Sequence, residues 1–326
     1  MSAHRRARRP GVSGTIARRS LVSVIVVVIL SLCAGRSALA FVRYKTSNGS
    51  LYYWPQTCVP LSAYPDSLTA ANGNMELSSA EVMNAVTLAA AQWGADSNAC
   101  TFVRLNVTQQ AGAPAATRLD YVNQVLFRTT GWSCPSGMAG PGCYDAMALA
   151  ITSVYVDTST GKIKDADIEI NAQGFSWADL VTDPALVGSS QDLQNALTHE
   201  MGHLIGLDHT CYIAGSVTTP PIDNSGQPIP DCDDATETVR ETTMAAVALR
   251  GDVGKRMLKA DDIAGVCDIY PVAMNPMTCP AKDVAPPTME ACRCDAGGAR
   301  GRSTGLAAGL LALAALVRRR RESRRR

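Results

Sequence analysis

The element that most constrains this chain is an eleven-residue run from His199 to His209, with the pattern H-E-x-x-H-x-x-G-x-x-H. On a helix, His199 and His203 would lie about 40° apart on one face, one turn from each other, so their imidazoles can hold one Zn²⁺. Glu200 then lies where it can act as a general base on a water that the metal activates. Gly206 can adopt the positive φ that ends a helix and reverses the chain, which returns His209 as a third ligand. Three protein ligands leave one coordination position open, as in catalytic zinc sites.

Histidine usage supports this interpretation. The chain contains four histidines, and His4 lies in a segment that is predicted to be removed on export. The other three all fall at the ligand positions of the run. A surface helix with unrelated histidines would not concentrate them in this way.

The run resembles the zinc signature of the metzincin clan of metalloproteases. Two later segments extend the resemblance to matrixin-like catalytic domains. Residues 241–246 look like the Met-turn that lies under the metal in that clan, with Met244 as its methionine, and residues 258–271 are similar to the last helix. Ala246 departs from those metzincins that place a tyrosine two residues after the methionine, so no metal ligand is expected there.

The resemblance covers roughly residues 41–275 and implies one catalytic domain. The implied fold is α+β, with a mixed, mostly parallel five-stranded sheet, an antiparallel edge strand, the zinc helix and a C-terminal helix. The implied activity is hydrolysis of peptide bonds in a protein or peptide substrate. Zn²⁺ would be the catalytic cofactor, Glu200 the general base and Met244 a hydrophobic floor under the metal.

Local patterns place the other elements. Ser78 and Glu81 form a capping box that begins a helix ending at Gly94. Strands are expected at 51–54, 101–107, 123–128, 146–156 and 162–171, the last two joined as a hairpin. By the resemblance, residues 149–156 would be the edge strand beside the cleft, which could bind an extended peptide by strand addition. The alternative is an ordinary edge that a loop covers.

The long segment after His209, residues 210–239, is rich in proline and expected to lie near the cleft. Its acidic residues Asp231, Asp233, Asp234 and Glu237 are a candidate site for structural Ca²⁺, because hard carboxylate ligands suit that ion in an exported protein. The alternative is that these side chains are simply solvated.

The N-terminal residues 1–40 are predicted to be a signal peptide that engages export machinery. Arginines precede an apolar run at 21–33, and Ala38, Leu39 and Ala40 form an A-x-A cleavage site. The mature chain would then begin at Phe41. Residues 18–21 leave a twin-arginine route open.

The C-terminal part divides into a linker at 276–291 and a segment at 292–326 that contains Cys292, Cys294, an apolar run and an arginine-rich end. The apolar run at 305–317 would form a helix of about 20 Å, which is short of the roughly 30 Å of a bilayer core. This arrangement resembles a sorting signal of the myxosortase type, which implies a sorting protease as partner and retention at the cell surface. The alternative is a plain membrane anchor, and membrane contact is expected only through this segment.

Charge excludes one class of partner. The net charge of +1 is unevenly distributed. Residues 1–40 contain seven arginines and no acid, and residues 292–326 contain ten arginines and two acids, so residues 41–291 keep 13 basic and 27 acidic residues. The predicted folded part is therefore strongly acidic, and nucleic-acid binding is not expected.

Cysteine usage indicates an oxidising compartment. Eleven cysteines are present, and eight of them lie in residues 41–291. Eight cysteines allow 105 pairings, so the connectivity is not determined by the sequence. Proximity favours Cys134–Cys143 and Cys211–Cys232, and elimination then leaves Cys58–Cys100 and Cys267–Cys279.

The sequence thus predicts an exported zinc endopeptidase, secreted or attached to the cell surface. Two alternatives remain, a catalytically inactive adhesion or binding protein with a metzincin fold and a zinc hydrolase of a non-protein substrate. The presence of Glu200 argues against the first. An edge strand that binds peptide backbone would argue against the second.

Overall fold

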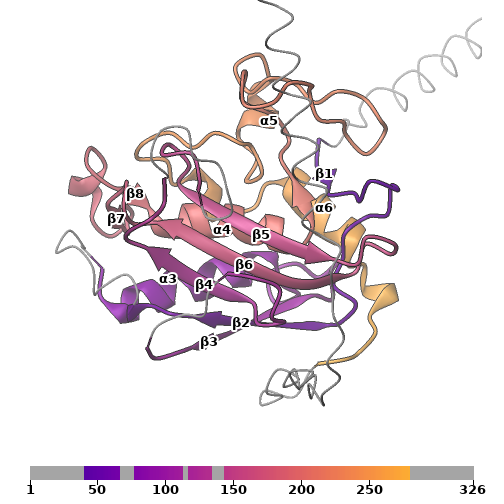
Figure 1. The fold of residues 1–326 in the computed structure, drawn as a ribbon, viewed down its shortest axis with the longest axis horizontal. Coiled ribbons are helices and arrows are strands. Elements are labelled where there is room, and N and C mark those ends of the chain that lie inside the picture. The colour runs from indigo at the N-terminus through magenta and orange to yellow at the C-terminus, as the bar shows by residue number, and fades with distance from the viewer. Residues whose placement is uncertain (1–39, 67–76, 113–116, 134–142, 280–326) are drawn as a thin grey trace, which may run out of the picture. The chain divides into compact units, whose positions relative to one another are not determined.

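The structure, a computed structural model, describes residues 40–66, 77–112, 117–133 and 143–279 (Figure 1). The predicted sorting segment and all but the last residue of the predicted signal peptide lie outside the described residues. Of the predicted linker, only residues 276–279 are described. In this described part of the chain, no helix is both long enough and apolar enough to cross a membrane.

A five-stranded sheet forms the centre of the fold, with the strand order β3-β2-β4-β6-β5 (Figure 1). Its strands are β2 (Cys58–Ala63), β3 (Arg104–Gln109), β4 (Gln124–Arg128), β5 (Ala150–Val156) and β6 (Ile163–Asn171). Neighbouring strands are parallel except for β5 and β6, which are antiparallel. β5 is therefore an antiparallel edge strand, and the predicted α+β class with a mixed, mostly parallel sheet is confirmed.

Helices and short elements complete the described fold. The helices are α3 (Ser79–Trp93), α4 (Leu193–Leu204), α5 (Glu237–Arg240) and α6 (Ala260–Ile269). The short strands are β1 (Val42–Arg43), paired with β9 (Leu207–Asp208), and β7 (Trp177–Ala178), paired with β8 (Gln191–Asp192). Three 3₁₀ turns are η1 (Pro184–Leu186), η2 (Gly254–Arg256) and η3 (Val272–Met274).

The local patterns explain the first helix and the hairpin. Ser78 and Glu81 form the predicted capping box at the start of α3, and the helix ends at Trp93 with Gly94 as its C-cap. The predicted hairpin is β5 and β6, and its turn contains Gly161 with φ +75°. A Cβ at Gly161 would overlap the backbone carbonyl of Leu51, so this turn requires glycine.

The prediction of a strand at residues 51–54 is wrong. Leu51 and Tyr53 form only isolated bridges, and the first strand of the main sheet is β2. The aromatic residues of 51–54 serve packing instead, as the buried Trp54 shows by donating its indole N–H to the carbonyl of Leu204 at 2.9 Å. β2 was not predicted because Pro60 lies within it, and a proline argues against a strand in sequence analysis.

The core lies between the sheet and the two long helices. α3 packs against α4, and both contribute to one cluster of buried apolar side chains that also includes residues of β2, β4 and β6. The indole N–H of Trp93, on α3, donates to the carbonyl of Thr198, on α4, at 2.7 Å. The indole of Trp54 donates to Leu204 at the end of α4, so two buried indoles fix the position of α4 against the core.

Three disulfides connect described residues: Cys58–Cys279, Cys100–Cys267 and Cys211–Cys232. The predicted Cys211–Cys232 pair is confirmed, and the predicted Cys134–Cys143 pair involves Cys134, which lies outside the described residues. The predicted pairs Cys58–Cys100 and Cys267–Cys279 are wrong.

The reason for this error is the return of the chain after α6. The backbone N–H of Val272 donates to the carbonyl of Cys100 at 3.2 Å, and the N–H of Thr57 donates to the carbonyl of Thr278 at 2.8 Å. The C-terminal end of the described chain thus lies beside the start of β2 and the end of α3, so each cysteine bonds to a partner far away in sequence.

Candidate metal centre

The helix that contains the zinc motif is α4, and a side chain caps its N-terminus. Asp192 is the N-cap, and its Oδ1 accepts the backbone N–H of Asn195 at 2.8 Å. His199 and His203 follow on α4, and the helix ends at Leu204. Gly206 then has φ +103°, and a Cβ there would come within 2.9 Å of the carbonyl oxygen of Tyr52. Both the turn and the close approach of the backbone therefore require glycine at 206.

The reversal at Gly206 brings His209 back to the helix. The Nε2 atom of His209 lies 3.2 Å from Nε2 of His199 and 3.1 Å from Nε2 of His203. Two nitrogens bound tetrahedrally to one Zn²⁺ at roughly 2.0–2.1 Å would be about 3.3 Å apart. The donor set and its spacing fit a zinc ion, and no other group of three or more His, Cys, Asp or Glu side chains is gathered in this way among the described residues.

The other ring nitrogens fix the orientation of the histidines. Nδ1 of His199 lies 2.7 Å from the carbonyl of Thr243, and Nδ1 of His203 lies 2.9 Å from the carbonyl of Leu207. A carbonyl oxygen only accepts, so both Nδ1 atoms carry the proton and both Nε2 atoms keep a lone pair for the metal. The hydroxyl of Tyr44 also lies 3.2 Å from Nδ1 of His203.

Burial keeps His199 and His209 neutral. It lowers their pKa values well below 6.5, and the nearby charge of Lys255 acts in the same direction. A neutral imidazole is the form that binds a metal, because protonation would occupy its lone pair. The site is therefore ready to bind a divalent cation at neutral pH.

Glu200 lies next to the ligands on α4 and is also buried. Its Oε2 atom accepts the hydroxyl hydrogen of Thr152, on β5, at 2.6 Å. Burial raises the pKa of Glu200, while the Thr152 hydrogen bond lowers it. The carboxylate thus has a fixed orientation beside the three histidines, and Thr152 is a residue that the sequence did not identify.

Met244, the methionine of the predicted Met-turn, packs against α4. It is 1% exposed, and a Cβ at Gly202 of α4 would overlap its sulfur atom. Asp262 of α6 holds the backbone here. Its carboxylate accepts the N–H of Thr243 at 2.9 Å and that of Met244 at 3.3 Å. Asp262 therefore positions the predicted Met-turn, a role that could not be read from the sequence.

A cavity of about 570 Å³ opens beside the histidines. Its walls come from β5 and the residues before it, from α4, from the segment after His209 and from the residues after Met244. The lining includes Leu149, Ala150, Ile151, Thr152, Asn195, Ala196, His199, Glu200, His203, His209, Tyr212, Ile213, Val217, Ile229, Val247, Ala248 and Lys255. The edge strand and the long segment 210–239 thus both lie beside the candidate centre.

The acidic residues proposed for Ca²⁺ are arranged differently. Asp231, Asp233, Asp234 and Glu237 do not converge on one point as the histidines do. The carboxylate of Asp231 instead accepts the backbone N–H of Asp233 at 3.0 Å. Calcium binding in this segment stays a prediction, because carbonyl oxygens and waters can complete such sites.

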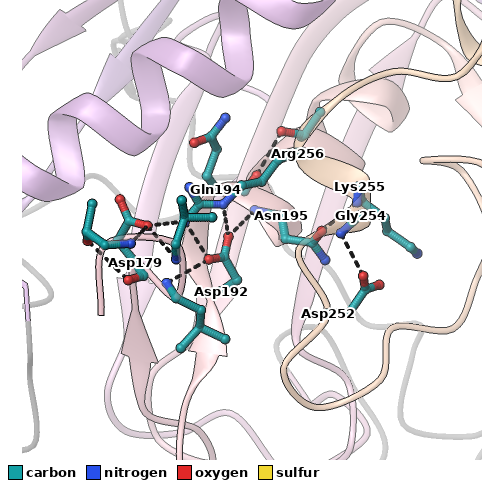
Figure 2. A network of polar contacts seen from close by, with 12 residues as sticks. Asp179, Asp192, Gln194, Asn195, Asp252, Gly254, Lys255 and Arg256 are labelled. Atoms are coloured by element: carbon teal, nitrogen blue, oxygen red, sulfur yellow. Dashed lines mark hydrogen bonds and ion pairs between the residues drawn. The ribbon is translucent and has the colours of Figure 1, made fainter. Parts of the chain in front are cut away.

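A partly buried ion-pair network, with Asp192 fully buried, holds the start of α4 (Figure 2). The guanidinium of Arg256 donates to Oδ1 of Asp192 at 2.8 Å and to its Oδ2 at 2.5 Å, and it also reaches Oδ1 of Asp179 at 2.5 Å. The side chain of Asn195 accepts the backbone N–H of Lys255 at 2.7 Å. The η2 turn is thereby attached to the first turn of the metal-binding helix.

Comparisons with known proteins add little to this geometry. No protein-family model matches the chain, and no curated protein matches it. Among solved structures, a chain of the GM1-bound form of the ECX AB5 holotoxin is similar, with 14% sequence identity and a TM-score of 0.33. The alignment covers 73% of this chain and 92% of that chain. The functional interpretation therefore rests on the site itself.

Proposed function

We propose that this chain is a zinc endopeptidase of the metzincin type, similar to the matrixins, that acts outside the cytoplasm on a protein or peptide substrate. The observation that carries the proposal is the convergence of three histidine Nε2 atoms beside a buried glutamate in an open cavity. Structural zinc sites have four protein ligands, whereas three histidines leave a position for a substrate or water.

His199, His203 and His209 would hold the metal. When bound, Zn²⁺ supplies a Lewis acid that lowers the pKa of water and polarises a carbonyl group. Glu200 accepts a proton from the water that attacks the scissile carbonyl and passes it to the leaving amine. Thr152 holds the Glu200 carboxylate through the 2.6 Å hydrogen bond, and the Thr243 and Leu207 carbonyls hold the rings of His199 and His203.

The position of β5 supports a peptide substrate. Among the described strands β5 pairs with β6 alone, so its outer edge has backbone groups that no strand of the main sheet bonds. Ala150, Ile151 and Thr152 of this strand line the cavity that also contains the histidines. An extended peptide that pairs with this edge would pass next to Glu200, which is the geometry that backbone hydrolysis needs.

Three disulfides in the described residues support an exported protein, because such bonds persist in oxidising compartments. Export through the signal peptide and attachment by a sorting protease that acts on the C-terminal segment belong to the same proposal. Contact with a membrane would be made only by that segment.

The test is proteolysis of a denatured protein by the purified full chain, beside Glu200→Gln and beside the chelator-treated protein. We expect the unmutated protein to cleave, Glu200→Gln to lose activity by about 10²–10⁴-fold, and the chelator to abolish cleavage reversibly. Each protein should retain one zinc by elemental analysis before chelation, since Glu200 is not a ligand. Zinc bound by both proteins without cleavage by either would instead support a binding protein. Equal cleavage by both would contradict the proposed mechanism.

A further inference from the structure

We propose that Lys255 makes this site selective for substrates that carry an acidic side chain on a residue next to the cleaved bond. This inference rests on the proposed function and adds a substrate class to it. It is drawn from the position of one buried cation in the wall of the catalytic cavity.

Lys255 lies in η2 and is 4% exposed, yet it lines the same cavity as His199 and Glu200. Its Nζ atom donates to the carbonyl of Ala245, the residue after Met244. Other residues lining the cavity include the apolar Ala196, Val247 and Ala248. A positive charge is thus held beside apolar side chains, in a cavity whose lining also includes the acidic Asp145, Glu200 and Asp208.

The ammonium group has no direct ion pair with a described residue, whereas the next residue, Arg256, pairs with both Asp179 and Asp192. The charges of Asp252, Glu200 and Asp262 act on Lys255 from further away. Figure 2 shows the Lys255 side chain running away from those two aspartates, and the nearby Asp252 carboxylate accepts the backbone N–H of Gly254 at 2.7 Å. An ammonium group has three hydrogens to donate, and the Ala245 carbonyl accepts one of them.

Carboxylates that are not in contact compensate a buried cation only in part, and a ligand that brings a carboxylate into contact removes part of the remaining cost. Burial lowers the pKa of Lys255 to about 8, which still leaves most of the amine protonated at neutral pH. A short carboxylate side chain that enters the cavity would find an apolar wall for its methylenes and the ammonium for its charge. Aspartate and glutamate have this shape and charge, whereas a basic side chain at the same place would be repelled by the Lys255 ammonium.

The experiment uses the full chain and has two steps. Cleavage sites in a denatured protein substrate are first mapped by mass spectrometry. Peptides with acetylated and amidated ends are then made in pairs that differ only by Glu or Gln next to the cleaved bond, so that no terminal carboxylate interferes. We expect kcat/KM to be at least about tenfold higher for the Glu peptide.

Three variants assign the preference to Lys255. Lys255→Met should bring the Glu-to-Gln ratio close to one, Lys255→Arg should retain a preference for Glu, and Lys255→Glu should favour a Lys peptide over the Gln peptide. The ratio is measured within each variant, so a loss of folded protein cancels. A purely structural role for Lys255 would lower both rates together and leave the ratio unchanged, which would overturn the proposal.

The failures of the two proposals can be told apart. Cleavage that depends on Glu200 but shows no preference for acidic residues overturns the role of Lys255 and leaves the peptidase proposal intact. Absence of any cleavage that depends on Glu200 overturns the proposed function, and the selectivity proposal with it.

Discussion

The carboxylate of Asp262 accepts the backbone N–H of Thr243 at 2.9 Å, and the carbonyl of Thr243 accepts the Nδ1–H of His199 at 2.7 Å. One buried aspartate of α6 is therefore linked to His199 of α4 through the backbone N–H and the carbonyl of one residue, Thr243. Through this link, a helix far along the chain takes part in the candidate metal centre. Groups that orient metal ligands commonly affect metal affinity as well as folding.

Asp262→Asn tests this link. Asp262 accepts N–H groups of Thr243, Met244 and Lys259, and an asparagine would place its own N–H₂ against one of these donors. We expect zinc affinity to fall by about tenfold and stability by about 1–3 kcal/mol. Competition with a chromogenic chelator measures the first and urea unfolding the second. Asp268→Asn is the matched control on the same helix, because that side chain is half exposed and, among the described residues, forms an ion pair only with Arg43. Equal effects of the two substitutions would contradict the prediction.

Thr152→Val removes the hydroxyl that holds Glu200 while keeping the shape of the side chain. The hydrogen bond between them is 2.6 Å long and joins β5 to α4. We expect kcat/KM for a peptide to fall by about tenfold, with zinc content unchanged, because the carboxylate loses its fixed orientation. Thr152→Ser, which keeps the hydroxyl, should retain most of the activity. A Thr152→Val protein as active as the unmutated one would show that this contact has no catalytic role.

The clustering of the three histidines could be predicted from the sequence because their arrangement is mostly local. A helix places His199 and His203 together, and a glycine turn only a few residues later returns His209. Thr152 and Asp262 could not be found in this way. Their roles depend on β5 and α6 packing against α4, and in the sequence each is an unremarkable threonine or aspartate.

The disulfides also show that contacts between residues close in sequence could be predicted, whereas long-range contacts could not. Cys211 and Cys232 are 21 residues apart and their pairing was predicted, whereas Cys58 and Cys279 are 221 apart and were assigned wrong partners. Proximity in sequence favours short loops, but the chain after α6 returns to β2 and places distant cysteines side by side. The strand β2 was missed for a different reason, because Pro60 lies within it and a proline argues against a strand.

Arg256→Met tests the network at the start of α4. The side chain of Asp192 is 0% exposed, so removal of Arg256 leaves a buried carboxylate without its cation at the N-cap of the helix. We expect the free energy of unfolding to fall by about 3–5 kcal/mol, as is typical for the loss of one partner of a buried ion pair. Urea unfolding measures this change. The control is Arg250→Met, since Arg250 is exposed and, within the described part of the chain, donates only to the Gly188 carbonyl at 3.3 Å. A change below about 1 kcal/mol for Arg256→Met would mean that the network contributes little to stability.

Asp167→Asn tests a buried carboxyl on β6, away from the metal centre. Asp167 is 0% exposed and forms no ion pair with a described residue, while Glu169 on the same strand pairs with Arg128 at 2.6 Å. Burial, and after it the charge of Asp165, raise the pKa of Asp167 to about 7.

Because this folded-state pKa lies above the unfolded value of about 3.9, the folded state binds the extra proton. The contribution of Asp167 to stability is therefore complete below about pH 4 and is lost as the pH rises towards 7. Asparagine stays neutral, so the variant should gain about 1–3 kcal/mol relative to the unmutated protein between pH 4 and pH 8. Urea unfolding at both pH values measures the difference, with Asp96→Asn, at an exposed carboxylate, as the control for loss of a charge. A difference that does not grow with pH would show that Asp167 is ionised in the folded protein throughout this range.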